Sequence, residues 1–406
     1  MTDTARSPDR RTQLTSTRWK RPNVWLGKLI PSLLLVFAVK GYSLVLREVL
    51  PLVYRRNPLS GLAYCGWVHG TLFLTGYSYF SVYFQSLDPP AQREAPAAVQ
   101  EKRVAHACDS AGEPVRCYRD RCDGAWQSIR TRHCRDCGTC REHFDHHCSF
   151  MDNCVSAATF KPFFTFLVYA ALLLAVALVP LAPLQLRACR EVIRTTWSAL
   201  RMQEAWWGKW WSWAGGPVFR YAGALFLGYR HYLDIAHTRP LLVQDVEQRT
   251  LVRDGRLYTY EAPLYPSLAI PRLSTLVIVL FATMICSIAV AMIFVIVRNS
   301  RTGDSAVQIE RTRRWRLQQG VVNPDYDARF RLWIPLPKEE HPVGGAVVLV
   351  EPDVPLFDLG PAENWRRLMG ERWWQWFVPW VPSRLSDFDL NPQVLASLQE
   401  QARKEQ

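Results

Sequence analysis

Long stretches without a charged residue are the feature that most constrains this 406-residue chain. Phe163 to Leu186 holds 24 residues and Leu273 to Val297 holds 25, and neither contains Asp, Glu, Lys or Arg. A helix needs about 20 apolar residues to cross a bilayer. Gly61 to Leu87 is also uncharged and long enough, whereas Leu29 to Leu46 carries Lys40, which could reach an interface. The pattern predicts an α-helical integral membrane protein with four transmembrane helices.

The charges beside these stretches predict their orientation. The first 28 residues carry seven Lys or Arg and lack the apolar core of a cleavable signal peptide. Basic segments next to a span stay in the cytosol, so the N-terminus is predicted to be cytosolic. An even number of spans then returns the C-terminus to the cytosol, together with the polar segment between the second and third spans.

The predicted layout has seven parts. In chain order they are a cytosolic basic N-terminus (1–28), the first two helices with a short luminal loop (29–87), a cytosolic cysteine-rich domain (88–162), the third helix (163–186), a long luminal loop (187–272), the fourth helix (273–297) and a cytosolic C-terminal tail (298–406). Residues 206–213 of the luminal loop hold five tryptophans, which are typical either of an interfacial anchor or of a packing surface. A net charge of +13 fits nucleic acid, acidic partners or an anionic membrane equally.

A dense cluster of cysteine and histidine lies in the cysteine-rich domain. Seven of the eleven cysteines fall within 38 residues: Cys117, Cys122, Cys134, Cys137, Cys140, Cys148 and Cys154. Four histidines lie among them: His133, His143, His146 and His147. A secreted disulfide framework has little need for these histidines, whereas zinc binds mixed thiolate and imidazole donors. The cluster therefore predicts zinc in a reducing compartment, which agrees with a cytosolic location.

A count of the possible zinc ligands indicates how many cysteines and histidines remain for catalysis. Two tetrahedral zinc sites need eight protein donors, and six cysteines with two histidines supply them if Cys148 is set aside. In one alternative, Cys148 is a zinc ligand, and either Cys117 or Cys122 is the cysteine that binds no zinc. Another reads the cluster as a nucleic-acid zinc finger, but a position between two spans disfavours it, so no nucleic-acid partner is expected.

The run from Asp145 to Cys148 contains the elements of an activated nucleophile. Thiolate is the reactive form of cysteine, and a nearby imidazole or metal increases its population. His146 suits the base that takes the thiol proton, and Asp145 suits the carboxylate that orients the imidazole, which leaves His147 for metal. Because sequence neighbours do not automatically face one another, we expect a turn that bound metal holds rigid.

The spacing resembles one known family. The pattern His-Cys-x2-Cys-x2-Cys-x4-Asp-His-His-Cys-x5-Cys, from His133 to Cys154, is similar to that of the DHHC protein S-acyltransferases, or palmitoyltransferases. Asp88-Pro89-Pro90 resembles the family's Asp-Pro-Gly motif, and residues 358–365 resemble a pattern in its tail. The long luminal loop and the tail are most similar to those of fungal members.

The resemblance implies an activity and its residues. It implies a catalytic Cys148 that carries the acyl group, with His146 as base and Asp145 as its orienting partner. It also implies two structural zinc ions, one on Cys117, Cys122, His133 and Cys140, and one on Cys134, Cys137, His147 and Cys154. The co-substrate would be an acyl-CoA such as palmitoyl-CoA, and Arg130 and Arg132 could either neutralise its phosphates or be solvated.

The implied setting is an endomembrane. The resemblance places the enzyme as a multi-pass protein in the lipid bilayer of the endoplasmic reticulum, Golgi or plasma membrane, acting on cysteine-containing, membrane-associated proteins. A catalytically inactive membrane zinc scaffold that binds partner proteins, and a membrane-tethered nucleic-acid binder, are the alternatives.

The sequence departs from the family pattern at three places. The family has two residues between its first zinc cysteines. It has a Pro-Trp after the Asp-His-His-Cys tetrad, which is Asp145 to Cys148 here, and a Thr-Thr-x-Glu motif after the last span. In this chain, four residues separate Cys117 from Cys122. Ser149-Phe150 follows Cys148, and Ser305-Ala306-Val307-Gln308 follows the last span. The nucleophile, base and carboxylate are intact.

Overall fold

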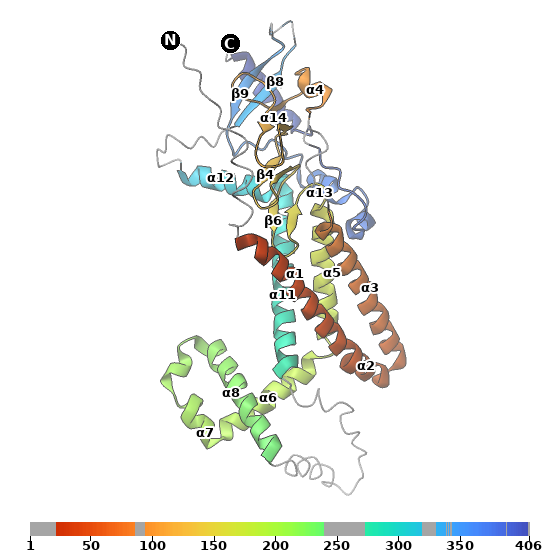
Figure 1. Cartoon of the computed structure of the whole chain (residues 1–406), viewed down its shortest axis with the longest axis vertical. Coiled ribbons are helices and arrows are strands. Elements are labelled where there is room, and N and C mark those ends of the chain that lie inside the picture. Colours follow the sequence, from red (N-terminus) through yellow and green to blue (C-terminus); the bar gives the residue numbers. More distant parts are fainter. Residues whose placement is uncertain are drawn as a thin grey trace. The chain divides into compact units, whose positions relative to one another are not determined.

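The computed structural model describes residues 22–85, 94–238, 273–318 and 330–404, apart from positions 338, 340, 342 and 387. Most of the basic N-terminus, the Asp88-Pro89-Pro90 motif and the second part of the predicted luminal loop lie outside the described residues. The helices of the N-terminal and central parts are α1 (Pro22–Leu44), η1 (Val45–Val49), α2 (Leu50–Arg56), α3 (Pro58–Tyr83), α4 (Ala97–Gln100), α5 (Phe160–Leu178), α6 (Ala182–Ser198), α7 (Leu200–Met202), η2 (Gln203–Trp207), η3 (Trp210–Trp213) and α8 (Gly216–Thr238) (Figure 1).

The C-terminal part continues with helices and two long strands. Its helices are α11 (Leu273–Asn299), η4 (Ser300–Thr302), α12 (Ala306–Gln318), α13 (Pro361–Met369), η5 (Trp373–Phe377) and α14 (Pro392–Lys404). The strands of the described residues are β1 (His106–Ala107), β2 (Arg116–Cys117), β3 (Ala125–Trp126), β4 (Arg132–Cys134), β5 (Thr139–Arg141), β6 (His146–Cys148), β7 (Asn153–Val155), β8 (Phe330–Pro335) and β9 (Gly345–Val350).

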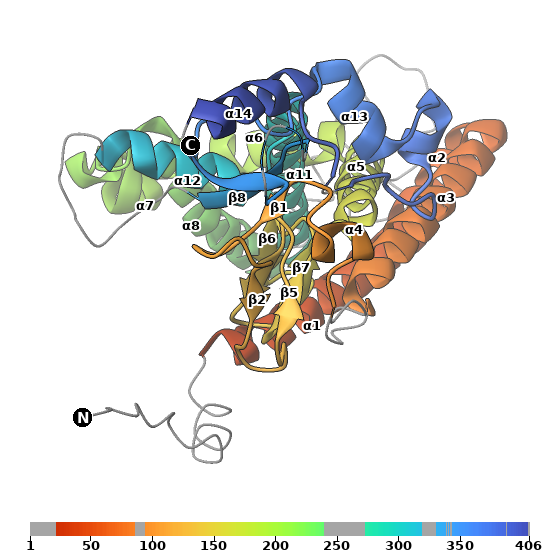
Figure 2. The same cartoon turned by 90° about the horizontal axis from the view of Figure 1, so that it is seen from above.

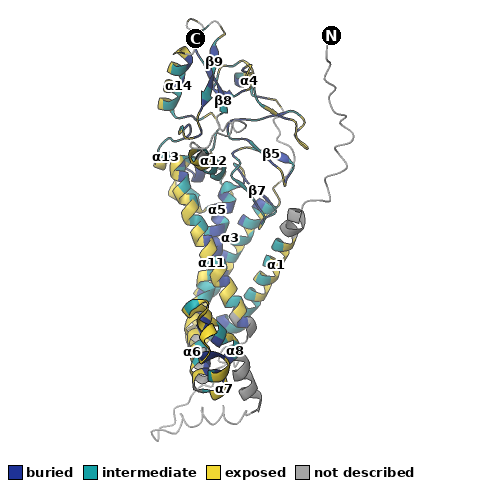
Figure 3. Ribbon diagram, turned by 90° about the vertical axis from the view of Figure 1, so that its left-hand side faces the viewer, coloured by how far each residue is buried: buried dark blue, intermediate teal, exposed yellow. Residues whose placement is uncertain are grey.

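Three helical segments of the described chain are long and apolar enough to cross a membrane. They are Leu29–Arg56, Phe160–Leu178 and Val277–Thr302. Large apolar side chains are exposed along much of the third segment, among them Phe281 and Phe294, as expected of a helix that faces lipid (Figure 3). The chain is therefore a membrane protein, with three candidate spans where the sequence predicts four.

The predicted second span forms helix α3, which is not one of these three candidates. In α3, hydroxyl groups and glycines lower the hydropathy. Thr71 Oγ1 donates to the carbonyl of Trp67 at 2.8 Å, and the hydroxyls of Ser78 and Thr165 lie 3.2 Å apart. These polar groups have partners within the protein, which is the condition for placing them in lipid.

The third predicted span ends earlier than expected. Helix α5 begins at Phe160 and stops at Leu178, whereas the uncharged run extends to Leu186. A turn that includes Pro180 separates α5 from α6, because proline lacks the amide hydrogen that would continue the helix. The remaining apolar residues begin α6 instead, so hydropathy alone overestimated the length of this span.

The chain divides into two compact units. One combines Leu72–Ala170 and Ile288–Gln406 with the N-terminal residues to Val36, and the other combines Phe37–Thr71 with Ala171–Ser287. In the second unit, the end of α1 continues through η1 and α2 without a break, and the chain turns back into the first part of α3 at Asn57. Val45 and Val49 pack with Tyr64 and Val68 in a buried cluster, so the two helices lie side by side as a hairpin.

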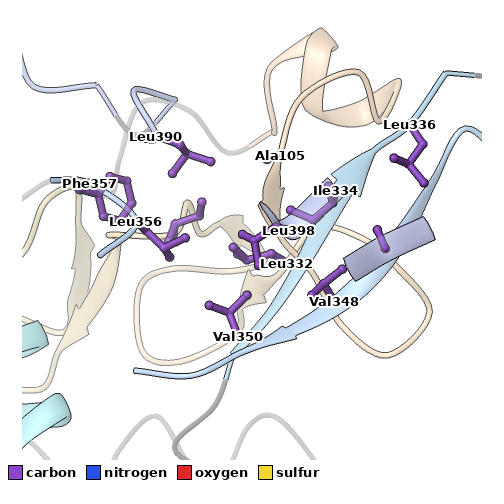
Figure 4. Packing of buried hydrophobic residues seen from close by; sticks show 12 residues of the cluster. Ala105, Leu332, Ile334, Leu336, Val348, Val350, Leu356, Phe357, Leu390 and Leu398 are labelled. Carbon is purple, nitrogen blue, oxygen red and sulfur yellow. The ribbon is translucent and has the colours of Figure 1, made fainter. Parts of the chain in front are cut away.

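A small antiparallel sheet in the first unit was not anticipated from the sequence. Its order is β1-β8-β9, so two residues ahead of the cysteine cluster pair with a strand of the tail, His106 opposite Trp333 and Ala107 opposite Leu332. Helix α14 packs on β8 and β9 (Figure 2). The enclosed apolar core includes Leu332, Ile334, Val348, Val350 and Leu398 (Figure 4). The tail and the cysteine-rich region thus share one fold.

Candidate metal centres and active site

Three short hairpins carry the cysteine cluster. They pair β2 with β3, β4 with β5, and β6 with β7. Two strand pairings place potential ligands directly opposite each other: His133 faces Cys140, and His147 faces Cys154. Since successive side chains of a strand point to opposite faces, neighbouring donors on β4 can serve different metal groups.

The first group of donors joins β2, β4 and β5. It contains Cys117, Cys122, His133 and Cys140. His133 Nδ1 lies 3.6 Å from Cys117 Sγ and 3.4 Å from Cys122 Sγ, and Cys122 Sγ lies 3.5 Å from Cys140 Sγ. The spacing of four residues between Cys117 and Cys122 still brings both sulfurs to the group, so this departure from the family pattern is accommodated.

The second group joins the β4–β5 hairpin with the β6–β7 hairpin. It contains Cys134, Cys137, His147 and Cys154. His147 Nδ1 lies 3.7 Å from Cys134 Sγ, 3.4 Å from Cys137 Sγ and 3.8 Å from Cys154 Sγ, and the sulfurs of Cys137 and Cys154 are 3.3 Å apart. Both groups therefore contain the residues that the family resemblance pairs.

The geometry of each group fits a zinc ion. In each set of four, the donor atoms all lie within 4.8 Å of one another. Ligands about 2.3 Å from a tetrahedral zinc are separated by roughly 3.8 Å, close to the spacings above. Three cysteines with one histidine is a common structural zinc set.

One outer contact supports the first group and was missed in the sequence. Asp120 Oδ2 lies 3.0 Å from His133 Nε2, the ring nitrogen that faces away from the sulfurs. Carboxylates often accept this hydrogen bond from metal-binding histidines and fix the ring. The only signal in the sequence was an acidic residue between Cys117 and Cys122.

Strand β6 separates the two neighbouring histidines. Residues two apart in a strand share a face, so His146 and Cys148 lie on one face and His147 on the other. His147 points to the sulfurs of the second group, while His146 interacts with the Cys148 side chain. The sequence led us to expect a rigid turn here, but the structure forms a strand that achieves the same separation.

Asp145 has two partners. Its Oδ2 lies 2.8 Å from His146 Nδ1, and its Oδ1 accepts a hydrogen bond of 2.6 Å from the backbone amide of Ala306. Ala306 begins α12 in the segment that departs from the Thr-Thr-x-Glu motif. Because a main-chain group makes this contact, the change of side chain at Ala306 leaves the contact intact.

The surroundings of His146 shift its pKa in two opposite directions. Burial lowers the pKa of His146, but the hydrogen bonds to Asp145 and Cys148 outweigh burial and raise the pKa to about 9. The edge of Phe163 meets the ring at a centroid distance of 5.5 Å. The ring thus lies between a carboxylate, a thiol and an apolar wall.

The end of α3 is fastened beside the tetrad by two residues outside the motif. Asn153 Nδ2 donates to the carbonyl of Val82 at 2.7 Å, and Tyr79 Oη donates to the carbonyl of Phe150 at 3.1 Å. Phe150 itself is exposed. Neither contact was predicted from the sequence, because a bond from a side chain to a backbone group leaves no spacing pattern.

Two arginines considered for phosphate binding are engaged within the protein. Arg130 donates to the carbonyl of Gly303 at 2.6 Å and to His143 Nδ1 at 2.9 Å, and its guanidinium stacks 3.6 Å from the ring centre of Phe357. Arg132 donates to backbone carbonyls of its own loop. Arg130 therefore joins the cysteine-rich region to the turn after α11.

Comparisons with known proteins agree with this site. Residues 116–313 match the model of the DHHC palmitoyltransferase family. The chain is 33% identical over 127 residues to probable protein S-acyltransferase 13 of Arabidopsis thaliana, covering 29% of this chain and 40% of the relative. It is 31% identical over 164 residues to probable protein S-acyltransferase 14 of the same plant, covering 36% and 52%. It is 32% identical over 100 residues to palmitoyltransferase ZDHHC15 of Xenopus laevis, covering 25% and 29%.

These alignments span about half or less of each relative's own length. The matches come from plants, animals and fungi, so the likeness to fungal members stays a prediction. The family match itself contains both metal groups, the tetrad and the turn that holds Asp145. Residues 116–313 therefore form a domain of the DHHC palmitoyltransferase family.

Proposed function

We propose that this protein is a membrane-bound protein S-acyltransferase that transfers a fatty acyl group from acyl-CoA to a protein cysteine through Cys148. The observation that carries the proposal is the contact of Asp145 with His146, which shares with Cys148 the face of β6 that points away from the second metal group. A nucleophile, a base and an orienting carboxylate are what a two-step thioester exchange requires.

In the first step, Cys148 attacks the acyl-CoA thioester. The Cys148 proton passes to His146, and the Cys148 sulfur forms a bond to the carbonyl carbon as the bond from that carbon to the CoA sulfur breaks. CoA leaves as a thiolate that takes this proton from His146, which leaves the ring neutral for the second step. In the second step, the thiol of a substrate cysteine gives its proton to His146 and its sulfur attacks the acyl-enzyme. The Cys148 thiolate leaves, and the number of thioesters is unchanged throughout.

Asp145 acts through His146 in this scheme. Its Oδ2 holds Nδ1 of the ring, so that the other ring nitrogen is directed to the reacting sulfur. The Ala306 amide in turn fixes the carboxylate. We therefore assign Cys148 and His146 as catalytic residues and Asp145 as their positioning partner.

The eight donors of the two groups would hold two zinc ions with a structural role. Bound zinc would cross-link three hairpins that contain only two or three residues per strand. In this arrangement His147 fixes the face of β6 opposite to Cys148. The residues of the chain, and not a metal-bound water, carry out the acyl transfer.

The membrane setting has a physical cause. Burying a methylene is worth about 0.8 kcal/mol, so holding the ~14 methylenes of a palmitoyl chain in water would cost on the order of 11 kcal/mol. Acyl transfer from palmitoyl-CoA is therefore expected beside the spans, on membrane-associated proteins.

The α1–α3 hairpin supports four spans. Asn57 alone separates α2 from α3, and the two helices pack side by side. If Leu29–Arg56 crosses the bilayer, α3 has to return across it, and its 26 residues reach about 39 Å. Four spans with a cytosolic N-terminus place the tetrad in the cytosol, and the membrane is that of the endoplasmic reticulum, Golgi or cell surface.

The test is self-acylation of the purified full-length protein with a labelled acyl-CoA, beside Cys148→Ser and Cys108→Ser. Cys108 is a buried cysteine outside both metal groups and serves as the matched control. We expect hydroxylamine-sensitive label on the parent and on Cys108→Ser, and none on Cys148→Ser, with two zinc ions in all three. A zinc-loaded parent that takes no label would contradict the enzyme and favour a zinc scaffold. Zinc loss in Cys148→Ser would make Cys148 a ligand.

A further inference from the structure

The C-terminal tail contains an uncharged, aromatic run of residues whose exposure to water would be unfavourable. Residues 373–382, here the tryptophan segment, read Trp-Trp-Gln-Trp-Phe-Val-Pro-Trp-Val-Pro and hold four tryptophans without a charge. Charged residues lie on both sides, Glu371 and Arg372 before it and Arg384 after it. The sequence predicts a wholly cytosolic tail, and this segment differs sharply from the rest of that tail.

Its large side chains are exposed. The exposed fractions are 70% for Trp373, 43% for Trp374, 48% for Phe377 and 57% for Trp380. Contiguous aromatic surface of this kind is rare on a soluble surface and marks contact with a protein or a membrane. Tryptophan in particular collects at the boundary between headgroups and hydrocarbon.

The segment is attached to α5 well inside that helix. The Tyr169 hydroxyl donates a hydrogen bond to the carbonyl of Phe377. Tyr169 lies nine residues after Phe160, about 14 Å along the helix at 1.5 Å per residue. The candidate span begins at Phe160. With the membrane surface at that residue, a contact about 14 Å along the helix lies below a headgroup layer of about 5–8 Å and at the level of the lipid tails.

A second contact also lies inside a helix, away from its end. Trp380 meets Tyr77 of α3 edge to face, with ring centres 5.4 Å apart. Tyr77 lies six residues before the end of α3 at Tyr83, about 9 Å along the axis. Two helices therefore locate the segment below the ends of both.

The start of the segment is anchored from α5 as well. The buried amine of Lys161 donates to the carbonyl of Met369 at 2.7 Å, and Phe164 packs against Trp365 at 5.5 Å. Leu368 and Met369 are buried against Phe164 in the same cluster. The chain thus descends along α5 from residue 161 to residue 169 as it runs from α13 into η5.

The backbone of the segment is suited to an apolar medium. Gln375 N donates to the carbonyl of Arg372, Val378 N to that of Gln375, and Val381 N to that of Val378. Trp376 Nε1 donates to the carbonyl of Gly370 at 2.9 Å. Polar groups in lipid must find partners within the protein, and these tight turns supply them.

We propose that the tryptophan segment enters the cytosolic leaflet of the bilayer beside α5 and α3, with Trp373, Phe377 and Trp380 in contact with lipid. The occupant of this exposed surface is the bilayer, because the segment continues the lipid-facing surface of a membrane-crossing helix. The tail is thereby held at the membrane at a second point in addition to α11. This inference requires α5 to cross the membrane and does not depend on acyl transfer.

Photo-crosslinking in nanodiscs of labelled phosphatidylcholine tests the proposal on the full-length protein. A benzophenone amino acid replaces Phe377 or Trp380 in the segment, Phe294 in α11 as a lipid-facing reference, and Tyr118 as a control. Phe294 is 68% exposed and Tyr118 is 72% exposed, and Tyr118 belongs to the cysteine-rich region. We expect lipid label at positions 377 and 380 to match that at 294, and none at 118.

The contrary outcomes are distinct. Label at 294 without label at 377 and 380 would overturn the proposal, and a crosslinked dimer at 377 or 380 would assign the surface to a second copy of the chain instead. Self-acylation measured on the same samples reports separately on the proposed activity. A protein that binds lipid at 377 but does not self-acylate would contradict the enzyme and leave the membrane segment standing.

Discussion

At the scale of single residues, the site depends on which face of a short strand each side chain takes. His146 and His147 are neighbours with the same chemistry, yet one interacts with Cys148 and the other faces the sulfurs of the second metal group. The alternation of β6 decides between them. The same principle lets His133 and Cys134 on β4 belong to different groups.

The role of Asp145 can be tested by exchanging one oxygen for an amide nitrogen. In Asp145→Asn the amide oxygen can still accept from Ala306 N, but the new NH2 group faces His146 Nδ1 and favours the wrong tautomer. Positioned acid–base groups contribute roughly 10²–10⁴-fold, so we expect a self-acylation rate lower by about 100-fold or more. Asp136→Asn, at an exposed position, is the control, and zinc content should stay at the parent value in both. An unchanged rate would show that Asp145 does not orient the base.

The contact of Asp120 predicts unequal metal affinities. Asp120→Ala removes the carboxylate 3.0 Å from His133 Nε2, and His133 is a donor of the first group and not of the second. Loss of an outer partner typically lowers metal affinity about 10–100-fold. Competition with a chelator should therefore release one zinc per chain before the other, whereas Asp136→Ala should follow the parent curve. Release of both ions together would show that the two groups do not bind independently.

At the scale of elements, the turn after α11 joins the tail to the tetrad. Gly303 has a φ of +68°, and its carbonyl accepts from Arg130. A Cβ at this position would lie 2.4 Å from the carbonyl oxygen of Phe357. Ala306, three residues later, holds Asp145. The left-handed glycine is what lets the chain pass this close to Phe357 before α12 begins.

We expect Gly303→Ala to destabilise the protein more than a glycine replacement without a clash. Gly216 provides the comparison, because its φ is +71° and no atom lies within 4 Å of the position that a Cβ would take there. A left-handed backbone costs about 1–2 kcal/mol for a residue with a Cβ. The free energy of unfolding of both variants should fall by this amount. Gly303→Ala should lose more, seen as a lower unfolding midpoint in detergent together with slower self-acylation. Equal midpoints would show that the turn relaxes without cost.

The sequence predicted the site better than the tail. Ligand chemistry restricts spacing, so the eight donors and the tetrad could be recognised within 38 residues. The pairing of His106 with Trp333 joins positions more than 200 residues apart, and a two-residue strand such as β1 carries no periodic signal. Lys161 and Met369 likewise meet only in three dimensions. The hydropathy pattern also did not predict that α5 would end at Leu178, shortly before Pro180.

At the scale of the whole molecule, the number of spans decides which compartment contains the tetrad. If α3 crosses the membrane, the N-terminus and the cysteine-rich domain lie on one side, and the segment from α6 to α8 lies on the other. If α3 does not cross, the N-terminus and the α6–α8 segment share a side. The hairpin at Asn57 and the packing of Val49 against the start of α3 favour the first arrangement.

Glycosylation reporters can distinguish these arrangements. The natural sequence contains no Asn-x-Ser/Thr acceptor, so an acceptor introduced at the N-terminus, at exposed Trp210 or after Lys404 reports on that site alone. With four spans, translation into microsomes should glycosylate only the acceptor at Trp210, since the lumen holds the transferase. If there are three spans and α3 lies outside the membrane, the acceptors at Trp210 and at the N-terminus should be either both glycosylated or both unglycosylated. In that case the tetrad would be separated by the membrane from the N-terminus, and a cytosolic acyl-CoA could reach Cys148 only if the N-terminus were luminal.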